Sequence, residues 1–175
     1  MELLHSAAIV PAVVAACCAA GARRHLLGSV LPSLLMILSM LDLASGSGVL
    51  WPIAWVALLL AVSPVPVAMA RRGGMPIGRM SPPEMALHTS IGLVVMAALT
   101  AFGGSKPMEQ AGHHTMPPVL MAVVGIVVGV YLVFTVVLAG SLSRAPRRSA
   151  LLEVEVAGMG VSIALMAIAG FWMAG

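Results

Sequence analysis

The stretch PVLMAVVGIVVGVYLVFTVVLAG, residues 118–140, is long and apolar and carries no charged side chain. A helix needs about 20 mainly apolar residues to cross a bilayer core that is about 30 Å thick. Backbone amides inside that core must find their partners within the same segment, and a helix meets this requirement. Residues 118–140 are therefore predicted to form a transmembrane helix.

The rest of the chain has the same character. Its 175 residues are 61% hydrophobic and 9% charged, whereas soluble domains carry about 25% charged residues. Because so few charges do not cover a soluble surface, we predict an all-α integral membrane protein, a single transmembrane helical domain over residues 1–175 in contact with the lipid bilayer. Six segments qualify as spans: residues 4–22, 26–45, 49–70, 85–103, 118–140 and 151–173.

The distribution of basic residues predicts the orientation of this six-transmembrane-helix bundle. Lys106 lies in the fourth connection. The other eight basic residues lie in the first, third and fifth connections: Arg23, Arg24, Arg71, Arg72, Arg79, Arg144, Arg147 and Arg148. Since basic residues in short loops stay in the cytoplasm, both termini and the fourth connection are predicted to be extracytoplasmic.

The second, fourth and sixth segments carry similar stripes of residues. The stripes are His25, Ser29, Ser33, Met36 and Met40 in the second segment, Met85, His88, Gly92 and Met96 in the fourth, and Glu155, Met159, Ser162 and Met166 in the sixth. Spacings of three, four and seven residues place each set on one helical face. We expect three helix-pair repeats whose alternate helices face a shared centre.

Methionine recurs in these stripes, and its soft thioether suits Cu(I). One interpretation is a copper path with Met36, Met40, Met96 and His88 among its ligands. The other is that methionine, which is unbranched and flexible, fills irregular gaps in the core of the bundle. For His88 and the neighbouring Glu84, which lie close to the start of their helix, contact with cytoplasmic water is an alternative to a binding role.

The fourth connection contains a second candidate metal site. The stretch GSKPMEQAGHHTMPP, residues 104–118, is a long polar stretch in an otherwise apolar chain. Its candidate ligands are His113, His114, Met108 and Met116, and imidazole together with thioether favours copper. The alternative is a solvated connector, because the ligands lack the fixed spacing of a zinc-finger motif.

The positions of glycine and proline lead to predictions about helix packing and helix ends. The pairs Gly125/Gly129 and Gly158/Gly160 are expected to let helices approach closely within the bundle. Prolines inside the segments, such as Pro64, are expected to kink or end helices. Cys17 and Cys18 are adjacent on one helix, where they make a poor disulfide or metal pair, so we interpret them as small apolar residues.

Two kinds of residue are expected near the ends of the spans. Trp51, Trp55 and Trp172 lie near predicted outer ends, where indole rings anchor at the lipid headgroups. Asp42 lies at the outer end of the second segment, and we expect it to be a solvated helix end, with a metal ligand on the same side as the fourth connection as the alternative.

Several stretches resemble an actinobacterial family of small multipass membrane proteins of unknown function. The resemblance rests on LLMILSMLDL (34–43), EMALHTSIGLVVMAAL (84–99), EVAGMGVSIALMAIAGFW (155–172) and GHHTMPP (112–118). It implies a bacterial plasma-membrane protein with six helices, His-and-Met stripes and a His-rich extracytoplasmic loop after the fourth span. In the sixth segment Glu153 and Glu155 stand where the family pattern would have histidine.

Two functions agree with these features. The first is a protein that binds or moves a soft transition metal, copper, through a bundle lined by methionine and histidine. The second is a non-catalytic accessory subunit that packs against a larger membrane complex. No catalytic motif is visible, so we expect no enzyme activity. Nucleic acid is not an expected partner either, because no basic patch is interleaved with aromatic residues.

Overall fold

The computed structural model describes residues 2–21, 30–45, 49–72, 83–103, 118–144 and 150–174. Seven helices occupy these ranges: α1 (Glu2–Gly21), α2 (Leu31–Ser45), α3 (Pro52–Val62), α4 (Val65–Arg72), α5 (Pro83–Gly103), α6 (Pro118–Arg144) and α7 (Ala150–Ala174). The predicted all-α class is therefore confirmed, and each of the six apolar segments contains helix.

Four stretches are long and apolar enough to cross a membrane: Pro52–Arg71, Glu84–Ala101, Val119–Arg144 and Ala150–Gly170. Two further apolar helical stretches, Ala7–Cys18 and Leu31–Leu43, are shorter. The structure thus has membrane-compatible helices in all six expected segments, with full spanning length in four of them. The number of spans and the side on which the termini lie stay predictions.

The third segment is interrupted between α3 and α4. Ser63 and Pro64 form a turn there, and the Pro64 carbonyl accepts the amide of Ala68 as the helix resumes. Proline has no N–H, so the carbonyl four residues before Pro64, that of Leu60, loses its helical partner. The Ser63 hydroxyl donates to that Leu60 carbonyl at 2.8 Å instead. The prediction that Pro64 interrupts a helix is confirmed.

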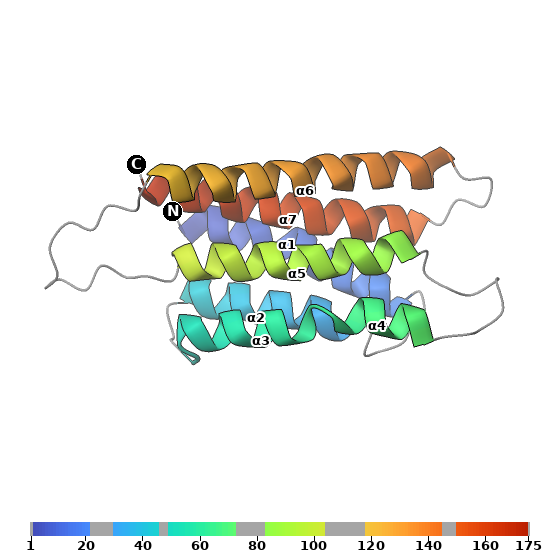
Figure 1. Cartoon of the computed structure of the whole chain (residues 1–175), viewed down its shortest axis with the longest axis horizontal. Helices are drawn as coiled ribbons and strands as arrows, with labels where there is room; N and C mark the ends of the chain where they lie inside the picture. The colour runs from blue at the N-terminus through green and yellow to red at the C-terminus, as the bar shows by residue number, and fades with distance from the viewer. Residues whose placement is uncertain are drawn as a thin grey trace, which may run out of the picture.

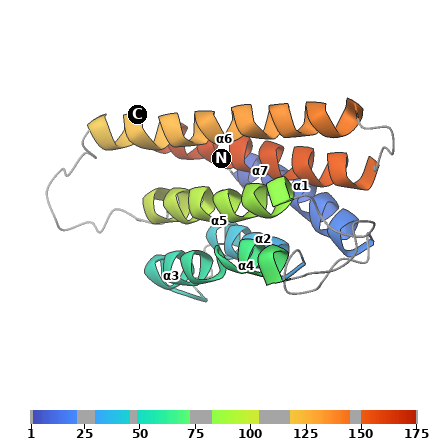
Figure 2. The ribbon, with the colours of Figure 1, turned by 45° about the vertical axis from the view of Figure 1, so that its right-hand side comes forward.

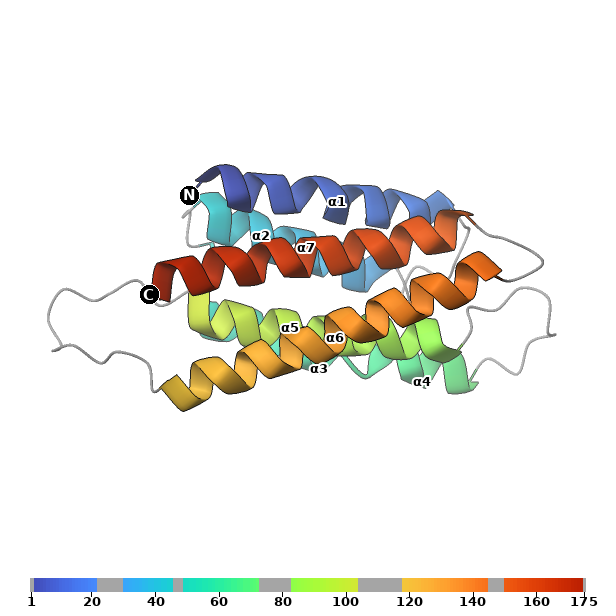
Figure 3. The same cartoon turned by 90° about the horizontal axis from the view of Figure 1, so that it is seen from above.

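The helices run along the long axis of the molecule, with α5 in the interior. It packs against α2, α3, α4, α6 and α7, and two views show it between α6 on one side and α3 and α4 on the other (Figure 1, Figure 2). Helix α7 lies along α1, as the view from above also shows (Figure 3). Because α5 has neighbours on most sides, its polar side chains His88, Thr89 and Thr100 are buried.

The two ends of the bundle differ in charge. The start of α1, the end of α5, the start of α6 and the end of α7 lie at one end (Figure 1). The end of α4, with Arg71 and Arg72, and the end of α6, with Arg144, lie at the other. Among the described residues, the arginines therefore gather at the end opposite the termini.

The stripes of α2, α5 and α7 face inward. All their described members are buried: Ser33, Met36, Met40, Met85, His88, Gly92, Met96, Glu155, Met159, Ser162 and Met166. Met36, Met40, Met96, Met159 and Met166 belong to one core cluster, which alanines of α1 and residues of α3 and α6 complete. The prediction that the stripes face a shared centre is confirmed for these five methionines, whereas Met85 belongs to a second, smaller cluster. His25 and Ser29 lie outside the described ranges.

The two glycine pairs behave differently. A Cβ at Gly158 would lie 2.8 Å from the carbonyl oxygen of Pro11 in α1, and a Cβ at Gly160 would lie 2.6 Å from Cγ2 of Thr135 in α6. Close packing within the bundle is thus confirmed for this pair. Gly129 is exposed, with nothing within 4 Å of its Cβ position, so the same prediction is wrong for Gly129, because that face of α6 points out of the bundle.

Asp42 and Trp55 correct two further predictions. Asp42 is buried, and its carboxylate accepts hydrogen bonds from the amides of Val49 (2.9 Å) and Leu50 (3.2 Å) and from Nε1 of Trp55 (2.6 Å). It therefore joins the end of α2 to the start of α3 and is not a solvated helix end. Trp55 is 6% exposed and lies in the core, whereas Trp51 is 79% exposed. Headgroup anchoring is wrong for Trp55 because its indole turns inward to Asp42.

Candidate functional site

His88 lies in α5 and is almost completely buried, with 1% of its surface exposed. Its imidazole stacks on the ring of Tyr131 in α6, with centroids 5.0 Å apart and planes inclined by 24°. The ring of Phe134 flanks it at 5.8 Å and 39°. The alternative of a histidine in contact with water at the helix end is wrong, because aromatic side chains of α6 cover the imidazole.

A hydrogen-bond chain fixes the imidazole further. Nε2 of His88 lies 2.9 Å from Oγ1 of Thr135, and that hydroxyl donates to the carbonyl of Tyr131 at 2.9 Å within α6. A threonine hydroxyl has one proton. Since Thr135 gives its proton to the carbonyl, it accepts from His88, and Nε2 carries a hydrogen. In the neutral imidazole the free lone pair is then on Nδ1.

Close contact with α7 determines the orientation of the Thr135 side chain. Its Cγ2 methyl faces Gly160, where a Cβ would come within 2.6 Å. With the methyl against α7, the hydroxyl turns toward His88 on α5. Three helices therefore meet at this threonine, and the absence of a side chain at Gly160 is what allows them to do so.

Tyr131 places an unusual polar group beside the imidazole. Its hydroxyl is buried and has no hydrogen-bond partner among the residues that the structure describes. It lies over Gly92 of α5, where a Cβ would be 3.0 Å from the phenolic oxygen and 3.6 Å from Cε of Met159 in α7. An unsatisfied buried hydroxyl costs about 1–3 kcal/mol, so a ligand that supplies a partner for it would gain affinity.

The resulting site, which we call the His88 site, consists of His88, Tyr131 and Thr135. Met159 lies beside it, and Met96 is on the same face of α5 as His88 and Gly92. Its donors are one imidazole, one phenol and the thioether of Met159, all buried. The thioether is a soft donor and imidazole also suits copper, so these two groups favour Cu(I), whereas the phenol oxygen is a hard donor.

The other candidate ligands are distributed as follows. Met36 and Met40 of α2 belong to the same core cluster as Met96. Met108, His113, His114 and Met116 lie outside the described residues. Within the described ranges, no three histidine, cysteine or acidic side chains group in a way that would hold a metal ion.

The acidic and cysteine residues differ in their exposure. Glu84 is exposed at the first turn of α5, and Glu155 is buried in α7, next to Val156 of a second, smaller core cluster. Cys17 is exposed and Cys18 half-buried, and both are free thiols. Their interpretation as small apolar residues agrees with this placement.

Sequence reasoning missed Tyr131 and Thr135. Both could have been identified from the sequence, because they are the only side chains with hydrogen-bonding N–H or O–H groups in residues 118–140. Their spacing of four places them on one face of the helix. Polar side chains inside a membrane span usually face the bundle and often mark function. That pattern was sufficient to single out this face of α6.

Comparison with protein-family models, curated proteins and solved structures finds no match to this chain. The resemblance to the actinobacterial family therefore stays a prediction.

Proposed function

We propose that this chain is an integral plasma-membrane protein that binds or moves Cu(I) through its methionine- and histidine-lined core. The proposed topology has six spans with both termini extracytoplasmic. It is supported by the apolar helices in all six segments and by the position of Arg71 and Arg144 at the end of the bundle opposite the termini. The resemblance to the actinobacterial family supports the bacterial plasma membrane as the location.

The observation that carries the copper proposal is the environment of His88. A metal-ligating histidine generally donates its other ring N–H to a fixed acceptor, which sets its orientation and tautomer. Thr135 provides such an acceptor at 2.9 Å. The nitrogen with the lone pair is therefore presented by a ring that aromatic packing and a hydrogen bond already hold in place, inside a core that also contains thioethers.

Movement of the ion follows from the weakness of its ligands. Met36 and Met40 on α2, Met96 on α5 and Met166 on α7 belong to one buried cluster. A thioether binds Cu(I) as a neutral donor. Exchange among several such donors lets an ion pass from one to the next. In this proposal His113, His114, Met108 and Met116 capture copper at the extracytoplasmic surface and deliver it to the core.

Copper content of the purified protein tests the proposal. Wild-type protein would be purified in detergent under reducing conditions with Cu(I), and its metal measured by elemental mass spectrometry. We expect near-stoichiometric copper, lost in a Met96→Leu/Met159→Leu variant. Leucine is close to methionine in volume, so the fold should tolerate the change.

Met121→Leu is the matched control. Met121 is half-buried in α6 and is not part of the core cluster, so this variant should keep its copper. Equal copper in all three proteins, or no copper in the wild type, would reject the core as the binding site. Copper accumulation and tolerance of cells that express the same variants provide an independent readout.

The outer face of α6 supports a second candidate function, an accessory subunit of a larger membrane complex. Ile126, Val130 and Val133 on this helix are each 65% exposed, and Gly129 between them has open space at its Cβ position. A flat apolar face with an exposed glycine accommodates another helix. Purification in a mild detergent distinguishes the candidates, because a subunit would bring a stoichiometric larger partner with it.

A further inference from the structure

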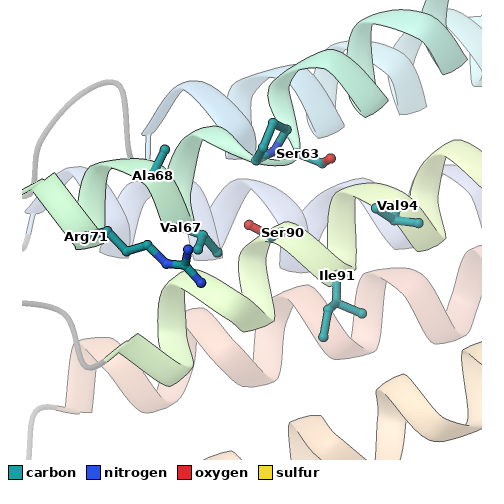
Figure 4. A pocket seen from close by; sticks show the side chains of 8 residues that line it. Ser63, Val67, Ala68, Arg71, Ser90, Ile91 and Val94 are labelled. Carbon is teal, nitrogen blue, oxygen red and sulfur yellow. The ribbon is translucent and has the colours of Figure 1, made fainter.

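A groove lies between the interrupted third segment and α5. Its volume is about 640 Å³, and residues of the α3–α4 junction, of α4 and of α5 line it (Figure 4). The groove follows from the turn at Ser63 and Pro64, which separates α3 from α4, and from the small side chain of Ala68 on the wall. Most of the lining is apolar, with Val67, Ile91 and Val94 along it.

Besides Ser63, whose hydroxyl is bonded to Leu60, two polar side chains distinguish this groove from an ordinary gap between helices. Arg71 supplies the one charge among its described lining residues, and a guanidinium is permanently protonated. Figure 4 shows the guanidinium extended along Val67 toward α5, near the arginine-bearing end of the bundle. Ser90 lies on the opposite wall of the groove, on α5, and farther from that end of the bundle than the Arg71 guanidinium.

Ser90 has a free hydrogen-bonding capacity. Its Oγ is buried and has no partner among the residues that the structure describes. Hydroxyls in helices commonly donate to the carbonyl four residues earlier. Thr89 and Thr100 of the same helix do so, to Met85 (3.0 Å) and Met96 (2.8 Å). Because Ser90 does not, its hydroxyl remains an uncommitted polar group beside the groove that Ser90 lines.

We propose that the groove binds an anionic phospholipid. The Arg71 guanidinium would pair with the headgroup phosphate, since guanidinium and phosphate form strong charge-assisted hydrogen bonds. The Ser90 hydroxyl, deeper in the groove, would donate to an ester carbonyl of the glycerol backbone. An acyl chain would then lie along Val67, Ile91 and Val94. Basic pockets between helices near the cytoplasmic surface recognise anionic headgroups in this way.

Lipid retention by the full-length protein tests this inference, which is independent of the copper proposal. Detergent-purified protein would be incubated with equal amounts of phosphatidylglycerol and phosphatidylcholine with identical acyl chains, and bound lipid counted by native mass spectrometry. Both lipids contain phosphate, but only phosphatidylglycerol has a net negative charge. We expect about a tenfold preference for phosphatidylglycerol, because the choline cation of phosphatidylcholine lies next to the phosphate and offsets its attraction to the Arg71 guanidinium.

Three variants separate the parts of the site. Arg71→Gln should remove the preference for phosphatidylglycerol. Arg144→Gln removes the same charge from the same end of the bundle but outside the groove lining, so it should keep the preference. Ser90→Ala should lower retention of both lipids and leave their ratio unchanged, because both lipids have ester carbonyls.

Several outcomes would overturn the inference. One is equal loss of preference in Arg71→Gln and Arg144→Gln, which would indicate a general surface-charge effect. Another is displacement of bound lipid by inorganic phosphate or glycerol phosphate alone at comparable concentration, which would indicate a small-anion site. A wild-type protein that retains neither lipid, or both equally, would also reject it.

Discussion

Nε2 of His88 on α5 and Oγ1 of Thr135 on α6 lie 2.9 Å apart, and both residues are buried. This contact links two helices through side chains 47 residues apart in the sequence. Because the Thr135 hydroxyl already donates within α6, the bond requires a proton on Nε2. One hydrogen bond thus determines both the packing of α5 on α6 and the tautomer of the imidazole.

Replacement of Thr135 with valine removes this acceptor while it preserves the shape of the side chain. The Nε2–H of His88 is then buried without a partner, and hydrogen bonds between membrane helices are worth about 0.6–2 kcal/mol. We expect the apparent unfolding temperature of the detergent-solubilised protein to fall by about 2–4 °C. Thr100→Val is the control, because the Thr100 hydroxyl bonds within its own helix. An equal shift in both variants would contradict an interhelical role for Thr135.

Gly92 and Tyr131 form a second testable pair. Gly92→Ala would place a methyl group 3.0 Å from the Tyr131 hydroxyl oxygen, and overpacking of this kind costs about 1–3 kcal/mol. Tyr131→Phe alone should be neutral or stabilising, because it removes a buried hydroxyl without a described partner.

The double variant Gly92→Ala/Tyr131→Phe should therefore be more stable than Gly92→Ala alone. Unfolding temperatures of the four proteins in the cycle give the coupling between the two positions. Strict additivity would mean that the hydroxyl is not what excludes a side chain at residue 92.

Glycines of α6 and α7 should respond in opposite directions to substitution by alanine. Gly158→Ala brings a methyl group to 2.8 Å from a backbone carbonyl of α1, which cannot move aside like a side-chain end. We expect a loss of about 1–3 kcal/mol. Gly129→Ala meets open space and gains helix propensity of up to about 1 kcal/mol. Thermal unfolding measures both changes, and a stable Gly158→Ala protein would argue against the tight packing of α1 on α7.

Asp42 is expected to stabilise the junction of α2 and α3. Its carboxylate accepts two backbone amides and the indole N–H of Trp55, and hydrogen bonds to a charged group are worth about 1.5–3 kcal/mol each. Asp42→Ala should therefore destabilise the protein strongly, with Asp42→Asn intermediate because its amide keeps one acceptor oxygen. Limited proteolysis near residues 49 and 50 gives a local readout, and unchanged cleavage in Asp42→Ala would count against this role.

Local sequence patterns predicted the helices and their inward faces well. The expected 85–103 and 118–140 became α5 (Pro83–Gly103) and α6 (Pro118–Arg144), because hydropathy over about 20 residues measures what a helix in a membrane requires. Helical periodicity likewise placed Met96 and Met159 in the core, since residues three and four apart share a face.

The His88 site could not be predicted from local sequence patterns. Which residue of α6 faces His88 is set by the rotation and register of α6 against α5, and these depend on long-range packing at residues such as Gly160. Asp42 shows the same limit at shorter range. Its partners Val49 and Leu50 lie seven and eight residues further along the chain, and hydropathy does not predict that their amides face the carboxylate.

Stabilisation by a soft monovalent ion distinguishes the core from the extracytoplasmic loop as the principal copper site. Ag(I) resembles Cu(I) in its preference for sulfur and does not require a reductant. A ligand that binds the folded state at 100 times its Kd stabilises it by about 2.7 kcal/mol. If the core binds the ion, Ag(I) should raise the unfolding temperature of the wild type by several degrees. His113→Ala/His114→Ala should then respond like the wild type, whereas His88→Gln and Met159→Leu should lose most of the response. The reverse pattern would assign the site to the loop and leave the buried methionines as packing residues.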